Sequence, residues 1–197
     1  MKILAFTDIH GSKSALRKLN QIARIRNPDA LVCAGDITIF ENNLSFFLRK
    51  INSIGKPVII VHGNHEEPSS FNVNLKNIYF IHKKHFIIDG VLFLGYGGGG
   101  FSKVDNDFKK TGKKFGEILA KNKSKKAVFV THAPPYKTRL DNIDGQHCGS
   151  KTLRQFAGKN KIGLWVCGHL HENFGKWDNI KNTRAVNPGK VGKIITI

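Results

Sequence analysis

Short, uninterrupted apolar runs alternate with amphipathic segments along the first third of the chain. Apolar runs at 2–7, 30–34 and 58–61 predict buried strands, because they are short and bounded by polar or turn residues. Between them, apolar residues recur at helical spacing, which predicts helices over 12–27 and 42–54. The order strand, helix, strand, helix, strand predicts a parallel sheet with helices on its faces.

The rest of the chain does not continue this alternation of strands and helices, because its expected strands are shorter and its turn residues more frequent. Asp89-Gly90 separates two of these strands, and this dipeptide is typical of a two-residue β-hairpin. The tail, 174–197, is expected to form short antiparallel strands around the turn Asn187-Pro188-Gly189. The other expected elements are strands at 78–81, 85–88, 91–95, 127–131 and 164–167, and helices at 107–120 and 150–160.

These elements predict an α/β protein, a two-sheet β-sandwich of mixed strands flanked by α-helices. The 197 residues fit a single domain, 1–197, which buries about 70% of the surface that its unfolded chain exposes. No apolar run approaches the roughly 20 residues that a membrane span needs. The N-terminus lacks the pattern of a signal peptide, so the cytoplasm is the expected location.

The charge is strongly positive. Lys and Arg number 32 against 14 Asp and Glu, which gives a net charge of +18. Such an excess attracts anions, including phosphate-bearing substrates and nucleic acid. A lysine-rich solvated surface is the alternative interpretation. The three cysteines show no CxxC spacing and are expected to be buried hydrophobic residues in a reducing compartment.

Five polar loops each follow a predicted buried strand, and each holds side chains able to bind metal. Sites in open α/β sheets form beyond the carboxyl ends of the strands, so loops far apart in sequence can meet there. The loops are Asp8-Ile9-His10, Gly35-Asp36, Gly63-Asn64-His65-Glu66, His132-Ala133-Pro134 and Gly168-His169-Leu170-His171.

The residue types of these loops indicate the chemistry. Carboxylate, imidazole and amide ligands without a thiolate suit divalent manganese, iron, cobalt, nickel or zinc. A carboxylate such as Asp36 can bridge two ions about 3.5–4 Å apart. A water between the ions then becomes hydroxide near neutral pH, and the ions clamp the attacking and leaving oxygens of a displacement at phosphorus.

The motifs DIH, GD, GNHE, TH and GHLH, in that order from Asp8 to His171, resemble the signature of the calcineurin-like metallophosphoesterases. The resemblance implies a two-sheet sandwich flanked by helices and two divalent metal ions. It implies that Asp8, His10 and His171 hold one ion, that Asn64, His132 and His169 hold the other, and that Asp36 is shared. His65 would bind no metal but contact the phosphoryl group and protonate the leaving oxygen. Glu66 stands where the family often has Asp, and a supporting role is expected for it.

The segment 134–150 starts directly after His132 and is polar and long enough to be functional. It could cover the site and bring Arg139 to the substrate phosphate. His147, ahead of Gly149-Ser150, resembles a feature of some small prokaryotic members of the family, which suggests a substrate or leaving-group role. A plain solvated loop is the alternative. His62 is a candidate neighbour of the ligands.

The leading functional hypothesis is a phosphodiesterase or phosphatase acting on small soluble phosphoesters. A metal-dependent nuclease on DNA or RNA is the alternative that the charge supports, although no aromatic-studded basic groove is visible in the sequence. A non-catalytic metal-binding scaffold is disfavoured, because every ligand and His65 are present. The arginine-bearing motifs of eukaryotic protein phosphatases are absent. The short strands offer an edge for a dimer.

Overall fold

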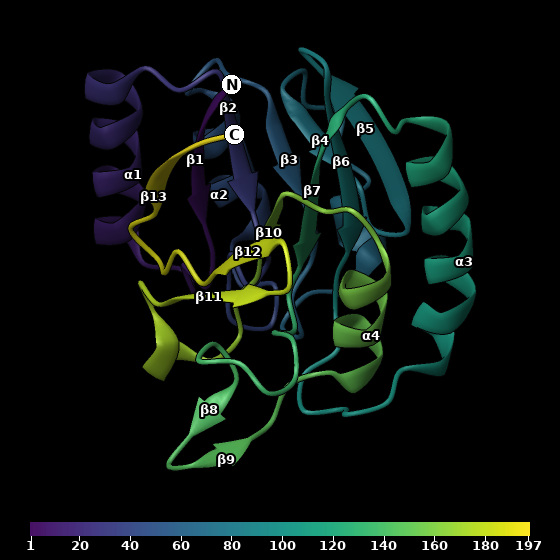
Figure 1. Cartoon of the computed structure of the whole chain (residues 1–197). Helices are drawn as coiled ribbons and strands as arrows, with labels where there is room; N and C mark the ends of the chain where they lie inside the picture. The colour runs from purple at the N-terminus through teal and green to yellow at the C-terminus, as the bar shows by residue number, and fades with distance from the viewer.

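Two mixed β-sheets pack face to face, with helices on both outer sides (Figure 1). The computed structural model describes residues 1–197. In the first sheet the strand order is β13-β1-β2-β3-β4, with β1 to β4 parallel and β13 antiparallel at the edge. The strands are β1 (Lys2–Phe6), β2 (Ala30–Cys33), β3 (Val58–Ile60), β4 (Ile78–Phe80) and β13 (Lys193–Thr196).

The second sheet has six strands in the order β11-β12-β10-β7-β6-β5. Its four central strands are parallel, and an antiparallel strand lies at each edge. The strands are β5 (Lys84–Ile88), β6 (Val91–Tyr96), β7 (Lys126–Thr131), β10 (Leu164–Val166), β11 (Trp177–Ile180) and β12 (Thr183–Val186).

The sandwich has a core on each side of each sheet. Along β1, Leu4 and Phe6 join the cluster beneath the helices, whereas Ile3 and Ala5 join the cluster between the sheets. This alternation follows from the two-residue repeat of a strand. The helices α1 (Lys13–Arg26) and α2 (Leu44–Asn52) cover the first sheet, and α3 (Asn106–Lys121) and α4 (Lys151–Lys159) cover the second.

Local signals fix several of these elements as the sequence predicts. Ser12 caps α1 by accepting a hydrogen bond from the Ala15 amide, and Asn27 ends the helix in the left-handed conformation. Asp89 and Gly90 both have positive φ, 47° and 73°, which is the type I′ geometry expected between β5 and β6.

The C-terminal tail differs from the prediction. Its antiparallel pair is β11–β12, which turns at 181–182 rather than at 187–189. Residues 187–189 instead begin a connection, with its turn at 190–191, that carries the chain from the second sheet to the first, where β13 pairs with β1. Burial explains the choice, since Ile195 on β13 joins the cluster between the sheets.

Three smaller elements complete the chain. The segment 134–150 carries a two-stranded hairpin of β8 (Asn142–Ile143) and β9 (Gln146–His147). Single 3₁₀ turns lie at Pro68–Phe71 and His171–Asn173. None of the four α-helices has the length and apolar character that spanning a bilayer requires. Both chain ends lie at the opposite end of the sandwich from the β8–β9 hairpin (Figure 1).

Candidate metal centre

Seven polar side chains converge where the two sheets meet at the carboxyl ends of their strands. They come from the loops after β1, β2 and β3 in the first sheet and after β7 and β10 in the second. The structure therefore brings together all the residues that the five motifs single out for metal. They are Asp8, His10, Asp36, Asn64, His132, His169 and His171.

Asp8, His10 and His171 form a first group. Asp8 Oδ1 lies 3.6 Å from His10 Nε2 and 3.5 Å from His171 Nε2. The two imidazole nitrogens are 3.0 Å apart. Because neutral imidazole has one lone pair and one N–H, two ring nitrogens this close need a proton or a cation between them.

Asn64, His132 and His169 form a second group. Asn64 Oδ1 lies 2.9 Å from both His132 Nε2 and His169 Nδ1. The other nitrogen of His132, Nδ1, lies 2.8 Å from the Ala34 carbonyl and donates to it, so that in the neutral ring the lone pair is on Nε2 and faces the group. This tautomer is the one that a metal ligand requires.

Asp36 touches both groups. Its Oδ2 lies 3.7 Å from His10 Nε2 and 3.3 Å from His132 Nε2. Metal bonds to nitrogen and oxygen of about 2.0–2.2 Å place neighbouring ligand atoms roughly 3–3.5 Å apart. The separations in both groups, 2.9 to 3.7 Å, are close to that range. The donor set and its spacing therefore fit two divalent ions that share Asp36.

Close backbone packing explains two glycines of the motifs. A Cβ on Gly63 would collide with the Asp36 carboxylate. A Cβ on Gly168 would collide with the side chains of Thr7 and Asp8. Each of these motifs therefore makes room for a carboxylate that belongs to another loop.

Glu66 binds the loops after β2 and β3 to each other. Its buried carboxylate accepts hydrogen bonds from the amides of Asp36 at 3.1 Å, Thr38 at 2.8 Å and Gly63 at 3.0 Å. Burial raises the pKa of Glu66, although the amide donors act in the opposite direction. The Glu66 side chain thus holds the two loops in place without being one of the seven residues.

The charges of the metal-free site are held by mutual contacts. Burial raises the pKa of Asp8, but hydrogen bonds from His10 and His171 outweigh it and hold the pKa well below its usual range. Burial lowers the pKa of His132, but its hydrogen bond and attraction to Asp36 raise it to about 9. Burial, followed by repulsion from His132, lowers the pKa of His169 to about 4.

His65 lies at the rim of the first group. Its amide donates to Asp36 Oδ1 at 3.0 Å, and its ring packs edge-on against His10, with 5.0 Å between centroids. The ring nitrogen Nδ1 is buried and has no hydrogen-bond partner in the protein. His65 is therefore anchored through its backbone, while its ring keeps hydrogen-bonding capacity beside the seven residues.

Arg139 and His147 stand apart from the seven. The Arg139 amide donates to Asp178, and its guanidinium makes no hydrogen bond or ion pair. His147 Nδ1 contacts Asp141 Oδ1 at 2.8 Å. Neither side chain makes a hydrogen bond, an ion pair or a ring contact with the seven residues, so their assignment to substrate binding stays a prediction.

Sequence reasoning missed two aromatic side chains beside the centre. Phe40 packs against His65 with ring centroids 4.7 Å apart, and Phe101 packs against His169 at 4.8 Å. The available signal for Phe101 was an apolar residue directly after a glycine-rich loop, whereas Phe40 follows other apolar residues, Ile37 and Ile39. His62, the expected neighbour of the ligands, accepts the Gly98 amide on its carbonyl and so holds the glycine-rich loop.

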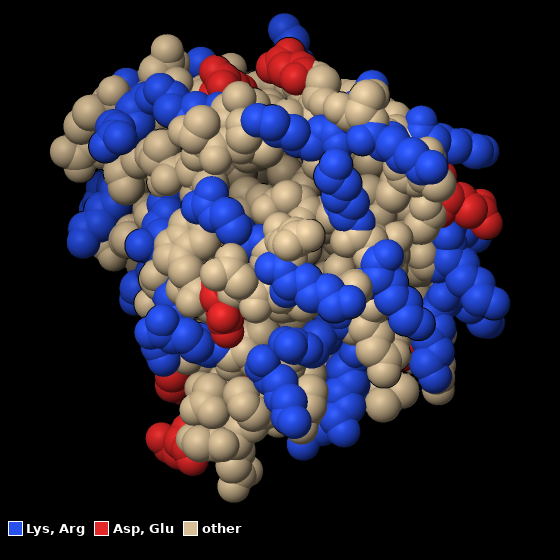
Figure 2. Space-filling view, viewed as in Figure 1, with Lys and Arg blue, Asp and Glu red and all other residues tan.

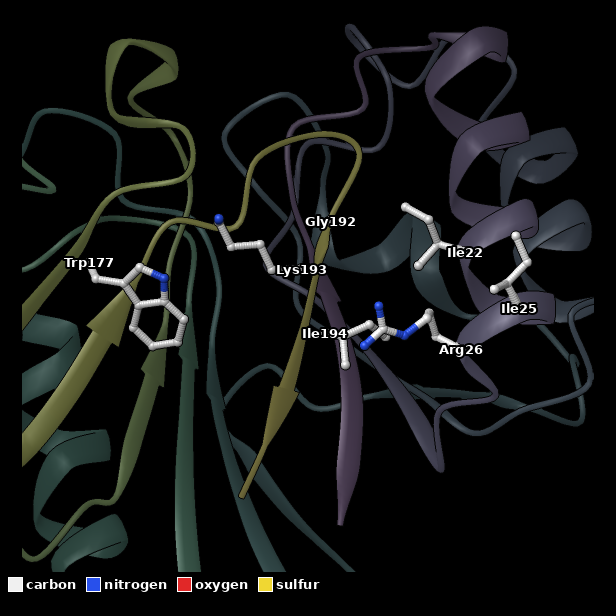
Figure 3. A pocket seen from close by; sticks show the side chains of 7 residues that line it. All are labelled: Ile22, Ile25, Arg26, Trp177, Gly192, Lys193 and Ile194. Carbon is white, nitrogen blue, oxygen red and sulfur yellow. The ribbon is translucent and has the colours of Figure 1, made fainter.

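A second hollow lies away from this centre. A groove of about 530 Å³ separates α1 from the ends of β13 and β11, with Ile22 and Ile25 on one wall and Trp177 on the other (Figure 3). No carboxylate or imidazole lines it. It therefore lacks the ligands that a site for divalent metal needs. The cleft at the centre has a volume of about 430 Å³.

Comparison with known proteins agrees with this geometry. Residues 1–173 match the sequence profile of the calcineurin-like phosphoesterases. The chain belongs to the calcineurin-like phosphoesterase family. As a member of this family it is a metallophosphoesterase, a hydrolase of phosphate esters.

Sequence relatives of this phosphoesterase come from an archaeon and a bacterium, and a solved structure from an animal has a similar fold. The protein MJ1162 of Methanocaldococcus jannaschii is 32% identical, over 95% of this chain and 88% of that protein. A probable glycerophosphodiester phosphodiesterase, GpdQ of Arcobacter nitrofigilis, is 25% identical, over 86% of this chain and 68% of that protein. The crystal structure of a dimetal phosphatase from Danio rerio superposes with a TM-score of 0.69 at 11% identity, covering 94% and 86% of the two chains. The last comparison shows a shared fold.

Proposed function

We propose that this phosphoesterase hydrolyses small soluble phosphate esters, diesters above all, at a centre of two divalent ions. The observation that carries the proposal is the pair of ligand groups joined by Asp36, whose Oδ2 faces His10 on one side and His132 on the other. A carboxylate placed between two ligand groups can hold two ions close enough to act together on one phosphoryl group. The preference for diesters is supported by the similarity to a probable phosphodiesterase.

In this proposal Asp8, His10 and His171 hold one ion, Asn64, His132 and His169 hold the other, and Asp36 contributes to both. When bound, such ions act as Lewis acids toward phosphoryl oxygens and generate a nucleophile from water near neutral pH. Manganese, iron, cobalt, nickel and zinc all suit these ligands.

The protein's own part is to fix the ligands and to move a proton. Asp8 Oδ2 accepts hydrogen bonds from Thr7 Oγ1 at 2.7 Å and from the His169 amide at 3.0 Å, which ties the loops after β1 and β10 together. His65, anchored on Asp36 through its amide, presents a ring to the cleft. We assign it the role of contacting the phosphoryl group and protonating the leaving oxygen.

The test begins with protein stripped by a chelator and reloaded with one metal at a time. Turnover of a chromogenic phosphodiester and of the matching monoester is measured, together with the number of ions bound per chain. We expect two ions and metal-dependent turnover. Asn64→Ala should bind fewer ions. His65→Ala should keep both ions but lose roughly 10²- to 10⁴-fold in kcat, the usual contribution of a general acid.

His85→Ala supplies the matched control, because His85 is an exposed histidine on β5, in the second sheet. It should keep full turnover and both ions. Two bound ions without turnover of either ester would contradict the proposal and favour the non-catalytic scaffold. Equal loss of activity in His85→Ala and His65→Ala would remove the role given to His65.

A metal-dependent nuclease is a second candidate, favoured by the unpaired positive charge. A single ion pair, Lys83 with Asp107, joins a lysine or arginine to a carboxylate in this chain of net charge +18. Turnover of DNA or RNA that falls steeply with salt would support it, because each phosphate contact releases counterions.

A further inference from the structure

Exposed apolar side chains gather on two segments beside the metal centre. Eight large hydrophobic residues of the protein are well exposed, and five of them lie on the segments 39–46 and 101–104. Single exposed apolar residues are ordinary, whereas five of the eight on two short segments that both reach the centre indicate a contact role. The five are Ile39, Phe40, Phe46, Phe101 and Val104.

Phe40 is held outward by its surroundings. Its side chain is 78% exposed, and its ring lies against His65. Phe40 and Glu41 both have left-handed backbone, with φ of 47° and 61°, a conformation that is strained for a bulky residue. The Glu41 carboxylate pins the turn by accepting from the Glu67 amide at 2.7 Å and Ser70 Oγ at 2.6 Å. The fold therefore keeps a strained turn whose effect is to expose the Phe40 ring to solvent beside the metal centre.

Phe101 has a similar setting on the other side. Its side chain is 63% exposed, and its ring lies against His169. It follows the glycine-rich loop, which is anchored where the Gly97 amide donates to His82 Nδ1 at 2.9 Å and the Gly98 amide donates to the His62 carbonyl at 3.0 Å. The loop that leads to Phe101 is thus held in place by hydrogen bonds at its start.

The two rings flank different halves of the centre. His65, which contacts the Phe40 ring, packs against His10 of the first group. His169, beneath Phe101, packs on His132 of the second group, with ring centroids 5.1 Å apart. A phosphate held between the two groups would have one exposed aromatic ring on each side. A phosphodiester has two ester substituents, and each can meet one ring.

The charge near the centre matches an anionic ligand. Lys190 lines the same cleft as His10, His65 and His171 and has no carboxylate partner. Lys13 lines the adjoining hollow beside His10. Flat aromatic surfaces next to unpaired lysines are the combination that binds single-stranded nucleic acid, by stacking on the bases and attraction to the backbone.

Resting on the phosphodiesterase function proposed above, we propose that the substrate is a phosphodiester with a nucleobase on each side, as in a short single-stranded oligonucleotide, and that Phe40 and Phe101 stack on the two bases. Hydrolysis adds one water across one P–O ester bond. The products are a nucleoside phosphate and a nucleoside with a free hydroxyl, and the leaving oxygen receives its proton from His65.

The test compares two matched dinucleotides. One is thymidylyl-thymidine, and the other carries tetrahydrofuran sugars in place of both nucleosides and so has the same phosphodiester without bases. Stacking is worth about 1–3 kcal/mol per base, so the base-bearing substrate should be preferred by roughly 5- to 150-fold in kcat/KM for each base that stacks. Phe40→Ala and Phe101→Ala should each reduce this preference, and the double variant should bring it near one.

Ile87→Ala is the control, since Ile87 is an exposed apolar residue on β5, outside the two segments. It should keep the wild-type preference. Phe40→Trp, which retains an aromatic face, should keep it as well. A second readout needs no catalysis: a dinucleotide containing 2-aminopurine should lose fluorescence on binding the metal-free protein, with weaker affinity for Phe40→Ala and Phe101→Ala.

Failure of base stacking and failure of phosphodiesterase activity give different results in these experiments. Equal turnover of both dinucleotides, unchanged by the phenylalanine variants, would overturn the stacking proposal and leave the phosphodiesterase standing. No turnover of either dinucleotide or of a chromogenic diester with any metal would overturn both. A base preference that survives in the double variant would assign recognition to other residues and also overturn the proposal.

Discussion

Asp36 is the residue on which the proposed centre most depends. Its Oδ2 faces both ligand groups, while its Oδ1 accepts the amide of His65. The backbone amide of Asp36 donates a hydrogen bond to the Glu66 carboxylate. Glu66 therefore helps to hold the Asp36 carboxylate in position. One side chain therefore sets the spacing of the two groups and the position of the proposed acid.

Replacement of Glu66 tests this support. Glu66→Ala leaves three buried amides without an acceptor, and each unsatisfied donor costs about 1–3 kcal/mol. We expect a loss of several kcal/mol in the free energy of unfolding, measured by urea denaturation. Glu67→Ala is the control, because that neighbouring side chain is exposed and accepts no hydrogen bond. Equal stability of the two variants would show that water replaces the lost acceptor.

His132 should make the stability of the metal-free protein depend on pH. Its pKa is raised from 6.5 to about 9 in the folded state, where burial opposes the shift and Asp36 drives it. The folded state therefore holds the proton more tightly, and the resulting stabilisation is complete below pH 6.5 and is lost as the pH rises toward 9. In chelator, Tm should fall by several degrees across this window.

Bound metal should reverse that trend, because a ligating imidazole must be neutral and metal competes with the proton. The stabilisation by added metal should therefore grow between pH 6.5 and 9. His132→Gln removes the titrating ring and should flatten the slope measured in chelator. The same slope in that variant would assign the pH dependence to another group.

The sequence predicted the seven converging residues but not the two aromatic rings. Each motif follows a buried strand, and the carboxyl ends of parallel strands share one edge, so His10 and His169 can be placed together without coordinates. Phe40 and Phe101 leave no such signal. An apolar residue in a loop can be buried or exposed, and for Phe40 the left-handed backbone at 40–41 belongs to the turn that leaves its side chain exposed.

Among the elements, the segment 134–150 is organised around one buried carboxylate. Asp141 accepts from the amides of Thr138 at 2.7 Å, Gly149 at 3.0 Å and Lys137 at 3.1 Å, and it contacts His147 at 2.8 Å. What looks in the sequence like a polar loop is therefore a folded unit that sets the orientation of His147.

Removal of this carboxylate should loosen the segment more than the core. In Asp141→Ala we expect faster proteolytic cleavage and faster amide exchange within 134–150, with smaller changes in β1 and β7. Asp144→Ala is the matched control, because Asp144 accepts no hydrogen bond and lies on the connection between β8 and β9. An equal increase in amide exchange over the whole chain of Asp141→Ala would instead show that the segment unfolds together with the rest of the protein.

Element types were predictable where burial dominates, and strand partners were not. The apolar runs specify strands on both sheets, and Asp89-Gly90 specifies a hairpin through its positive φ. In the tail, the turn signal at 187–189 is as strong as that of a hairpin, yet β12 and β13 belong to different sheets. Pairing across the whole chain length, such as β13 with β1, depends on long-range burial that local pattern does not contain.

At the scale of the molecule, positive charge dominates the surface. Figure 2 shows lysine and arginine side chains scattered across the whole of one face, with only a few acidic side chains among them. Several lysine side chains line a hollow of about 460 Å³ around the starts of β7 and β10, among them Lys125 and Lys161. With net charge +18 and a single ion pair that joins a lysine to a carboxylate, self-repulsion opposes folding.

Salt should therefore stabilise the protein. Tm should rise by a few degrees as sodium chloride increases from about 20 to about 200 mM, because the Debye length falls to roughly 7 Å. Lys125→Glu combined with Lys161→Glu should raise Tm at low salt and weaken the salt dependence. A Tm that falls with salt would mean that favourable charge contacts outweigh the repulsion.

We also propose that residues 1–197 fold as a single domain. The cluster between the sheets contains Ile3 and Val32 from the first sheet together with Phe93 and Val128 from the second, so neither sheet is covered without the other. Metal-loaded protein should unfold in one transition, with circular dichroism and tryptophan fluorescence changing together. Two separate transitions would divide the chain into two folding units.

The position of β13 has a consequence for biosynthesis. Residues 2–80 supply four strands of the first sheet, but the fifth, at 193–196, leaves the ribosome after all the others. Until then β1 keeps one edge unpaired, and an open edge is a template for association with other chains. This edge of the first sheet therefore stays open to other chains until residues 193–196 have been made, and pairing of β13 with β1 then closes it.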